Sequence, residues 1–267
     1  MKIRINEQSA TVADGLTIGE LAASHKPGAD VLILNGFPVP PGTEIHEGDA
    51  VFMILRGEIP AEVELERLMA ARHTPGVHAR LKAATVGIAG AGGLGSSVAV
   101  ALARVGVGRL VIADFDVVEP SNLNRQQYFI DQIGLPKVQA LAANLQRINP
   151  YVSVEPHPVL LDPSNIPAVF AACGIIVEAF DRADMKAMLV DTVLAQMAGV
   201  TVVAASGLAG FGPNNAITTR KIASRLYLCG DGTSAAQPGS WLMAPLVGIA
   251  AGHQAKQVLR IILGEEE

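Results

Sequence analysis

Cysteine is scarce in this sequence, since the 267 residues include only Cys173 and Cys229. Two thiols are too few for a disulfide framework or for a zinc site made of four thiolates. The chain also has no C-x-x-C pair, so we expect no zinc. This cysteine usage favours the reducing cytoplasm, and we expect Cys173 to be a core residue.

Charged residues are also few, at 17%, and the formal net charge is -5. An acidic balance gives no general electrostatic reason to bind nucleic acid or an anionic membrane. Long apolar runs are absent as well: residues 241–251 form the most apolar late stretch, which is too short to span a bilayer. Residues 1–5 alternate instead of forming the apolar stretch of a signal peptide. We therefore expect a cytoplasmic protein without nucleic-acid or membrane partners.

Half of the residues are hydrophobic, which is enough for one substantial core and a small additional domain. We predict a first domain over residues 1–57 and a second over residues 58–267. In the first, apolar residues alternate near the start, Thr17 can cap a short helix, and residues 31–34 form an apolar strand before an Asn-Gly turn. Residues 50–55 read as the last strand.

The second domain alternates strand and helix patterns. The segments are, in order, residues 85–89, 96–105, 109–113, 137–148, 152–155, 174–178, 185–197 and 201–205, with one further strand near 224–228. Such alternation predicts a mostly parallel sheet with helices on both faces, which is a Rossmann-like, doubly wound α/β fold. We expect residues 62–72 to form a charged helix that leads into this domain.

A glycine-rich loop separates the strand at 85–89 from the next helix. Its glycines are Gly90, Gly92, Gly93 and Gly95. Without side chains, the backbone N–H groups of such a loop can approach a phosphate closely, and the helix N-terminus adds a favourable dipole. The pattern predicts a nucleotide site, and by itself it fits NAD as well as ATP.

The residues after the next strand favour one kind of nucleotide chemistry. Asp114 lies at the spacing for hydrogen bonds from ribose hydroxyls, which again fits both nucleotides. Asn122, Arg125 and Lys137 follow it. Hydride transfer does not require such a group beside the phosphates, whereas nucleotidyl transfer needs cationic donors for the charge on the α-phosphate and the departing pyrophosphate.

The segment D-F-D-V-V-E-P-S-N-L-N-R-Q at residues 114–126, with Pro136-Lys137 after it, resembles the signature of the E1-like adenylating family of ThiF, MoeB and HesA. Residues 33–36 and 47–51 are similar to the ubiquitin-like β-grasp carriers ThiS and MoaD. The combination looks closest to a ThiF without zinc that carries a fused, ThiS-like β-grasp domain.

This resemblance implies roles for individual residues. The implied nucleotide-binding residues are the four glycines, Asp114 for the ribose, Asp116, Asn122 for the phosphates and Gln126 in support of the loop. The implied catalytic residues are Arg125, Lys137 and Asp181, of which Asp181 would also hold Mg²⁺. The family usually shows D-x-x-D-N where this chain has Glu178-Ala-Phe-Asp181-Arg182, so Arg182 is a departure.

Two further residues and one segment match the family more loosely. Arg72 stands where many relatives carry an arginine that reaches ATP, and a helix-ending arginine is an equally good explanation. Cys229 could accept sulfur, although a buried structural cysteine is the simpler interpretation. Residues 243–255 resemble a strand-to-helix element of the family whose role is architectural.

The resemblance implies an enzyme that uses ATP and Mg²⁺ to adenylate the C-terminal glycine of a separate ThiS-like sulfur carrier in thiamine thiazole synthesis. The alternatives are a MoaD-like carrier of molybdopterin synthesis, an NAD-dependent dehydrogenase, and a nucleotide-binding regulator without turnover. We expect a homodimer. The first domain should be an accessory domain, because Gly57 is amide-linked to Glu58 and lacks the free carboxylate of a carrier.

Overall fold

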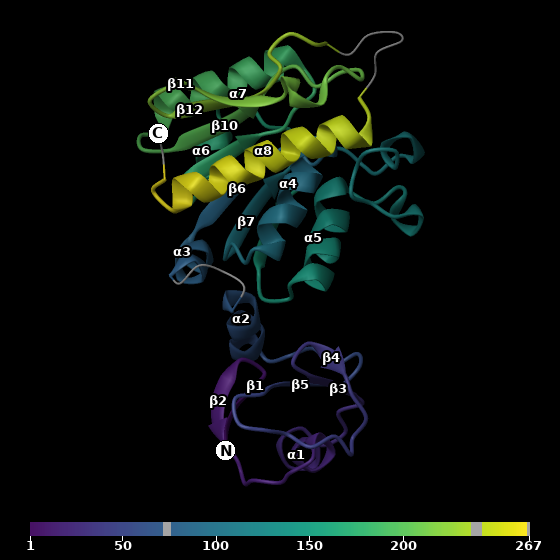
Figure 1. Cartoon of the computed structure of the whole chain (residues 1–267). Helices are drawn as coiled ribbons and strands as arrows, with labels where there is room; N and C mark the ends of the chain where they lie inside the picture. Colours follow the sequence, from purple (N-terminus) through teal and green to yellow (C-terminus); the bar gives the residue numbers. More distant parts are fainter. Residues whose placement is uncertain (72–75, 236–241, 266–267) are drawn as a thin grey trace. The chain divides into compact units, whose positions relative to one another are not determined.

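The computed structural model describes residues 1–71, 76–235 and 242–265. The chain folds into two compact units, Met1–Pro75 and Gly76–Glu267. Figure 1 shows their elements in chain order. No helix in the described part of the chain has both the length and the apolar composition to cross a membrane.

The described part of the first unit forms a five-stranded sheet and confirms the expected β-grasp fold. Its elements are β1 (Lys2–Ile5), β2 (Gln8–Thr11), α1 (Ile18–His25), β3 (Val31–Leu34), β4 (Phe37–Pro38) and β5 (Ala50–Ile54). The strand order is β2-β1-β5-β3-β4, with β1 and β5 parallel in the middle. Thr17 caps α1 and pairs with Glu20 in a capping box, so the predicted cap is confirmed.

The core of this unit lies between α1 and one face of the sheet. Buried Ile18 and Leu21 of α1 pack with Ile3, Val51 and Met53 of the strands. A further helix, α2 (Glu62–Ala70), belongs to this unit. The sequence pattern alone assigned that helix to the start of the second domain.

The second unit contains, within its described residues, a seven-stranded sheet. Its strands are β6 (Thr85–Ala89), β7 (Arg109–Ala113), β8 (Ser153–His157), β9 (Ile175–Glu178), β10 (Thr201–Ala205), β11 (Thr218–Ala223) and β12 (Leu226–Gly230). They lie in the order β11-β12-β10-β9-β6-β7-β8. All described pairings are parallel except that of β11 with β12. Without the edge strand β11, this is the doubly wound order 3-2-1-4-5-6, which confirms the Rossmann-like prediction.

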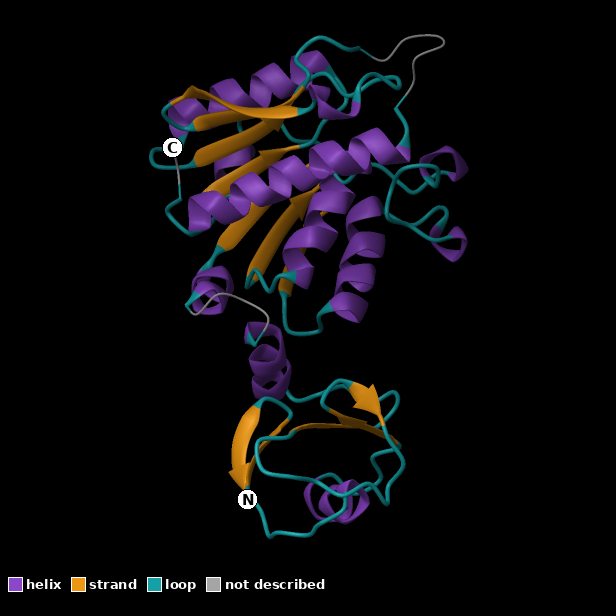
Figure 2. Cartoon of the chain, in the orientation of Figure 1, coloured by secondary structure: helices purple, strands orange, loops and turns teal. Residues whose placement is uncertain are grey.

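Helices cover both faces of this sheet (Figure 2). They are α3 (Val77–Ala83), α4 (Gly93–Arg104), α5 (Lys137–Ile148), α6 (Ile166–Val169), α7 (Ala183–Gln196) and α8 (Ala244–Ile262), with 3-10 turns η1 (Pro120–Asn122), η2 (Ile130–Gln132) and η3 (Asn214–Ala216). One buried cluster joins α4, α5 and α8 to the sheet, and a second joins α6 and α7 to its other face. The apolar strands are therefore covered on both sides, as continuous apolar runs require.

The strand order creates a switch point between β6 and β9. From these central neighbours the chain continues toward opposite edges of the sheet. In open α/β sheets ligands bind in the crevice at the carboxyl ends of the strands where the order reverses. The glycine loop after β6, Asp114 after β7 and Asp181 after β9 all follow carboxyl ends at this edge.

Candidate functional site

The glycine loop after β6 is packed too closely for side chains. A Cβ on Gly95 would lie 1.8 Å from the carbonyl oxygen of Gly90. Gly90 itself has a φ of 99°, and a Cβ there would lie 2.8 Å from the carbonyl oxygen of Ala179. The loop thus turns tightly into α4 and packs directly on the residues that follow β9, an approach of two backbones that only glycine permits.

Asp114 fastens the glycine loop to the end of β7. Its Oδ2 accepts a hydrogen bond from the Ala91 N–H at 2.6 Å, and its Oδ1 accepts one from the Asp116 N–H at 2.8 Å. Burial raises the pKa of Asp114, while these hydrogen bonds and the charge of Lys137 act in the opposite direction. Asp114 therefore shapes the loop, and its contact with ribose stays a prediction.

Lys137 is a buried cation close to this loop. It begins α5, and its side chain is 7% exposed. Its Nζ lies 2.8 Å from Oδ2 of Asp116, whose side chain is 48% exposed, and its backbone N–H donates to the Asp116 carbonyl at 2.9 Å. The hydrogen bonds of Asp114 with Ala91 and Asp116 connect this ion pair to the glycine loop.

Arg125 lies against the glycine loop itself. A Cβ on Gly93 would meet Cγ of Arg125 at 3.4 Å. The guanidinium donates to the Ser121 carbonyl at 3.2 Å and to Oδ1 of Asn124 at 2.8 Å. These acceptors are neutral, so a phosphate could compete for the cation with ease.

Two side chains next to Arg125 also face the loop. Nε2 of Gln126 would lie 3.9 Å from a Cβ on Gly92, and its Oε1 is buried without a hydrogen-bond partner among the described residues. Such an unsatisfied acceptor is rare and is expected to gain a donor from a ligand or water. The Tyr128 hydroxyl donates to the Ala91 carbonyl at 2.7 Å.

Asn122 supports this segment from within. Its Oδ1 accepts from the Glu119 N–H at 3.0 Å, and its carbonyl accepts from the N–H groups of Arg125 and Gln126 at 3.1 and 2.9 Å. The buried Asn122 side chain thus stabilises the turn that presents Arg125. Its contact with a phosphate stays a prediction.

Asp181 lies on the turn between β9 and α7. Its side chain is exposed, and within the described residues it accepts no hydrogen bond and forms no ion pair. The turn is joined to the end of β6, just before the glycine loop, because the Ala179 N–H donates to the Ala89 carbonyl at 2.9 Å. Arg182 pairs with Asp184 at 2.5 Å, whereas Arg72 lies outside the described residues.

Glu178, at the end of β9, has a different environment from Asp181. It is fully buried, and both of its carboxylate oxygens lie 3.0 Å from Nζ of Lys186. Burial raises the pKa of Glu178, whereas Lys186 and the N–H groups of Phe180 and Ala205 act in the opposite direction. Both oxygens are thus engaged inside the protein, so this carboxylate is not available as a metal ligand.

Sequence reasoning missed Lys186 and Tyr128. A buried carboxylate needs a cationic partner, and α7, the helix after Glu178, contains one lysine, Lys186. The sequence could therefore have indicated this ion pair. The Tyr128 hydroxyl bond crosses 37 residues of the chain and leaves no local pattern.

The cysteines are both buried, at 3% exposure for Cys173 and 0% for Cys229. The core position of Cys173 is confirmed. Burial raises the pKa of the Cys229 thiol to about 11, with Oγ1 of Thr219 3.5 Å from its Sγ. A neutral, enclosed thiol is a poor nucleophile, which favours the structural interpretation of Cys229.

The fold and the site define a doubly wound α/β protein with a glycine loop at its switch point. A model described as the ThiF family matches residues 65–267, and one described as ThiS-like ubiquitin matches residues 1–57. The chain belongs to the ThiF family, and it carries a ThiS-like domain ahead of the ThiF domain.

Named relatives agree with this membership. The adenylyltransferase and sulfurtransferase UBA4 of Yarrowia lipolytica is 32% identical over 69% of this chain and 47% of the relative. The SAMP-activating enzyme E1 of Haloferax volcanii is 44% identical over 42% of each protein. These matches span less than half of each relative's length.

Solved structures share the fold. The E. coli tRNA N6-threonylcarbamoyladenosine dehydratase TcdA, in complex with ATP, has a TM-score of 0.69 at 19% identity, covering 78% of this chain and 98% of its own. E. coli MccB with MccA-N7isoASN has a TM-score of 0.55 at 26% identity, covering 72% and 60%.

Proposed function

We propose that this chain is an adenylyltransferase that uses ATP to activate the C-terminal glycine carboxylate of a separate, small β-grasp carrier protein. The observation that carries the proposal is the gathering of Arg125 and the buried Lys137 around the glycine loop. Two cations beside phosphates serve nucleotidyl transfer, whereas in a dehydrogenase the phosphates only anchor the cofactor. The close-packed glycine loop at the N-terminus of α4 fits a bound nucleotide.

In this reaction an oxygen of the carrier's terminal carboxylate attacks the α-phosphorus of ATP. A new P–O bond joins the glycine to AMP as the bond to the bridging oxygen of pyrophosphate breaks, and pyrophosphate leaves with the electron pair. Arg125 and Lys137 would neutralise the charge that builds on the α-phosphate and the leaving group. No covalent intermediate on an enzyme side chain is required, which agrees with the enclosed state of Cys229.

Asp181 fits a role in holding Mg²⁺. Mg²⁺ is commonly bound by one or two carboxylates together with substrate phosphates and waters. Asp181 offers an exposed carboxylate on a turn whose residue Ala179 packs against Gly90. Bound there, the ion would neutralise phosphate charge. No group of three His, Cys, Asp or Glu side chains suited to a metal occurs among the described residues. We propose that the protein holds no zinc, and elemental analysis of the purified chain should find none at stoichiometric level.

The relatives support the activity, and the first domain guides the choice of carrier. UBA4 is named an adenylyltransferase, and the Haloferax volcanii relative is named an activating enzyme. We favour a ThiS-like carrier, and hence thiamine thiazole synthesis in the cytoplasm, because the fused first domain is itself ThiS-like. A MoaD-like carrier is the sibling alternative.

We propose that the first unit is an accessory domain and not the substrate. The segment after β5 turns back at Gly57, where φ is 77°, and the Glu58 N–H donates to the Leu55 carbonyl at 3.2 Å. Just before the turn, Arg56 pairs with Asp30 at 3.2 Å. A carrier tail must instead extend freely to reach an α-phosphate.

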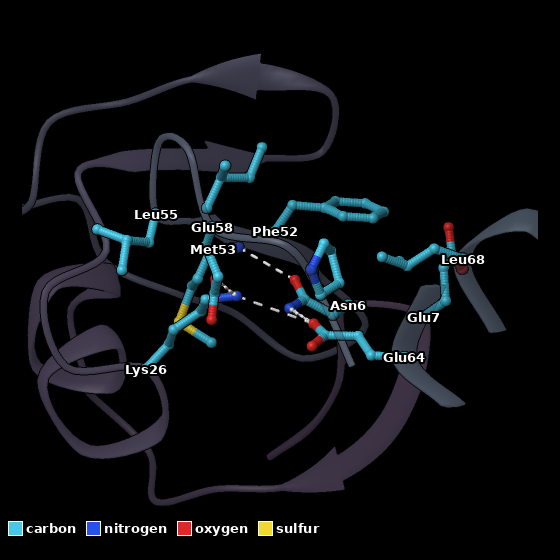
Figure 3. A pocket seen from close by; sticks show the side chains of 11 residues that line it. Asn6, Glu7, Lys26, Phe52, Met53, Leu55, Glu58, Glu64 and Leu68 are labelled. Atoms are coloured by element: carbon cyan, nitrogen blue, oxygen red, sulfur yellow. Dashed lines mark hydrogen bonds and ion pairs between the residues drawn. The ribbon is translucent and has the colours of Figure 1, made fainter. Parts of the chain in front are cut away.

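Further contacts fasten the chain beyond this turn, around a pocket of about 260 Å³ (Figure 3). Lys26 of α1 pairs with Glu58 at 2.5 Å. Asn6 accepts from the Met53 N–H at 3.1 Å and donates to Glu64 of α2 at 3.2 Å. Limited proteolysis of the intact chain should therefore spare the bond after Gly57, and cleavage or adenylation there would contradict the accessory role.

We also propose a homodimer. Several large apolar side chains are exposed between β7 and α5; they are Phe115, Phe129, Ile130, Ile133 and Leu135. Burial of such side chains against a second copy of the chain would remove this apolar surface from water. Light scattering at working concentration should give twice the mass of one chain, and a monomer would contradict this proposal.

Exchange of labelled pyrophosphate into ATP tests the activity. We expect exchange that requires Mg²⁺ and a carrier with a free C-terminal glycine, with the C-terminally amidated carrier as the matched inactive control. Tight ATP binding without exchange by any carrier would favour the regulator. NAD binding without ATP binding would favour the dehydrogenase.

A further inference from the structure

Asp181 is exposed on the turn after β9, so a role in holding a metal ion would require that this turn be held rigidly. The obvious neighbour does not supply such support: Arg182 points to Asp184 in an ion pair whose side chains are 69% and 62% exposed. Exposed pairs of this kind contribute little to rigidity. The support must come from the buried side of the turn.

Glu178 holds the turn from the buried side through its carboxylate. One carboxylate oxygen accepts from the Phe180 N–H at 2.7 Å, inside the turn itself, and the other accepts from the Ala205 N–H at 3.3 Å, at the end of β10. The side chain thus ties the residue just before Asp181 to the neighbouring strand. Because Glu178 is 0% exposed, these bonds are protected from water.

Lys186, on the helix that follows the turn, pairs with Glu178. It lies in the first turns of α7, and its Nζ is 3.0 Å from each oxygen of Glu178. The turn that carries Asp181 is therefore bridged by an ion pair between the strand before it and the helix after it. A buried carboxylate with a single cationic partner depends strongly on that partner.

Gln254 of α8 completes the network from a third element. Its Nε2 donates to the Glu178 carbonyl at 2.9 Å and to the Val203 carbonyl at 3.1 Å. The glycine loop also contacts this turn: a Cβ on Gly90 would lie only 2.8 Å from the Ala179 carbonyl oxygen. The Asp181 turn is thus held between the glycine loop, β10, α7 and α8.

We propose that Glu178 and Lys186 are positioning residues that fix the Asp181 carboxylate relative to the glycine loop, so that it can hold Mg²⁺ against bound phosphates. This inference rests on the proposed function in one respect, namely that the ligand of this site is ATP with Mg²⁺. In this chain the ion pair supplies the support that the exposed Arg182 does not. Outer residues that orient a metal ligand typically change metal affinity or activity about 10- to 100-fold when removed.

The test measures equilibrium ATP binding to the full chain, with Mg²⁺ and with a chelator, without any carrier. Lys186→Met should lose about 10- to 100-fold of the Mg²⁺-dependent gain in ATP affinity and retain the affinity seen in chelator. Lys186→Arg should keep the gain, because it restores a cation to Glu178. In an Asp181→Asn background, Lys186→Met should have no further effect, since Lys186 acts through Asp181.

Two further variants separate positioning from folding. Glu178→Gln/Lys186→Met removes both charges, so it should regain thermal stability relative to Lys186→Met while still lacking the Mg²⁺-dependent gain. Arg225→Met is the matched structural control, because Arg225 fastens the other end of α7 through the Leu194, Met197 and Val200 carbonyls.

Arg225→Met should lower the unfolding temperature and leave the Mg²⁺ response unchanged. A normal Mg²⁺ response in the doubly neutral variant, or an equal loss in Arg225→Met, would overturn the inference. Pyrophosphate exchange is a separate assay that contains a carrier. Its absence in the wild type would contradict the proposed function, whereas the positioning role is decided by the Mg²⁺ response measured here without a carrier.

Discussion

The ammonium of Lys137 lies 2.8 Å from a carboxylate oxygen of Asp116, and the lysine side chain is 7% exposed. Through Asp114, this pair is connected to the backbone of the glycine loop. Asp116 thus pairs with the buried ammonium and orients it next to the glycine loop. Because Asp116 is half exposed, its solvation allows it to share the lysine with an incoming phosphate.

Replacing either cation should slow turnover more than it weakens nucleotide binding. We expect Lys137→Ala and Arg125→Ala each to reduce the rate of adenylation by roughly a thousandfold, because the charge they neutralise is greatest in the transition state. Single-turnover kinetics together with ATP binding measures both quantities. Lys256→Ala, at an exposed site on α8, is the control and should keep the normal rate. A near-normal rate for Lys137→Ala would remove it from the catalytic group.

Asp181→Asn should abolish Mg²⁺-dependent activity while the fold survives. The carboxylate is exposed and bonds to no described residue, so its removal costs little packing or hydrogen bonding. Thermal unfolding and adenylation assays over a range of Mg²⁺ concentrations test this. If the unfolding temperature fell in parallel with activity, Asp181 would be a structural residue instead.

Gly95→Ala should damage both the loop and nucleotide binding. The added Cβ would lie 1.8 Å from the Gly90 carbonyl oxygen, so the backbone must shift, at a cost of about 1–3 kcal/mol or more. Gly174→Ala is the control, because a Cβ there meets nothing within 4 Å. Denaturant unfolding and ATP titration of both variants check the prediction, which fails if Gly95→Ala binds ATP normally.

Cys229 should resist alkylation in the native protein. Its thiol pKa is raised to about 11, and that of Cys173 to about 12, so near pH 8 both thiols are protonated as well as enclosed. Unfolding restores ordinary thiol pKa values and access, so both should then react with iodoacetamide. Mass spectrometry of native and denatured samples counts the labels. Rapid native labelling of Cys229 would reopen a role for it in sulfur transfer.

The buried strands could be read from the sequence because their apolar runs are continuous. β6, β7 and β10 begin and end at the predicted residues, since each is covered on both faces and needs no alternation. β11 was not anticipated. It is an exposed edge strand rich in polar residues, and its partner β12 rather than its own pattern sets its register.

In the site too, some features could be predicted from the sequence and others could not. The glycine loop and its packing follow from local spacing, because close backbone approach requires glycine. The pairing of Lys186 with Glu178 depends instead on how α7 returns over β9, which no short motif encodes. The helix α7 also begins two residues earlier than predicted. Its N-cap, Arg182, makes no side-chain capping hydrogen bond, so the sequence carries no cap signal at the start of this helix.

The most direct test of the account is the mass of candidate carriers after incubation with the intact chain and Mg-ATP. We predict that a ThiS-like carrier with a free C-terminal glycine gains the mass of one AMP, with one pyrophosphate released for each adenylate, while the chain itself keeps its mass. Tight ATP binding with no adenylate on a ThiS-like or MoaD-like carrier would contradict the account.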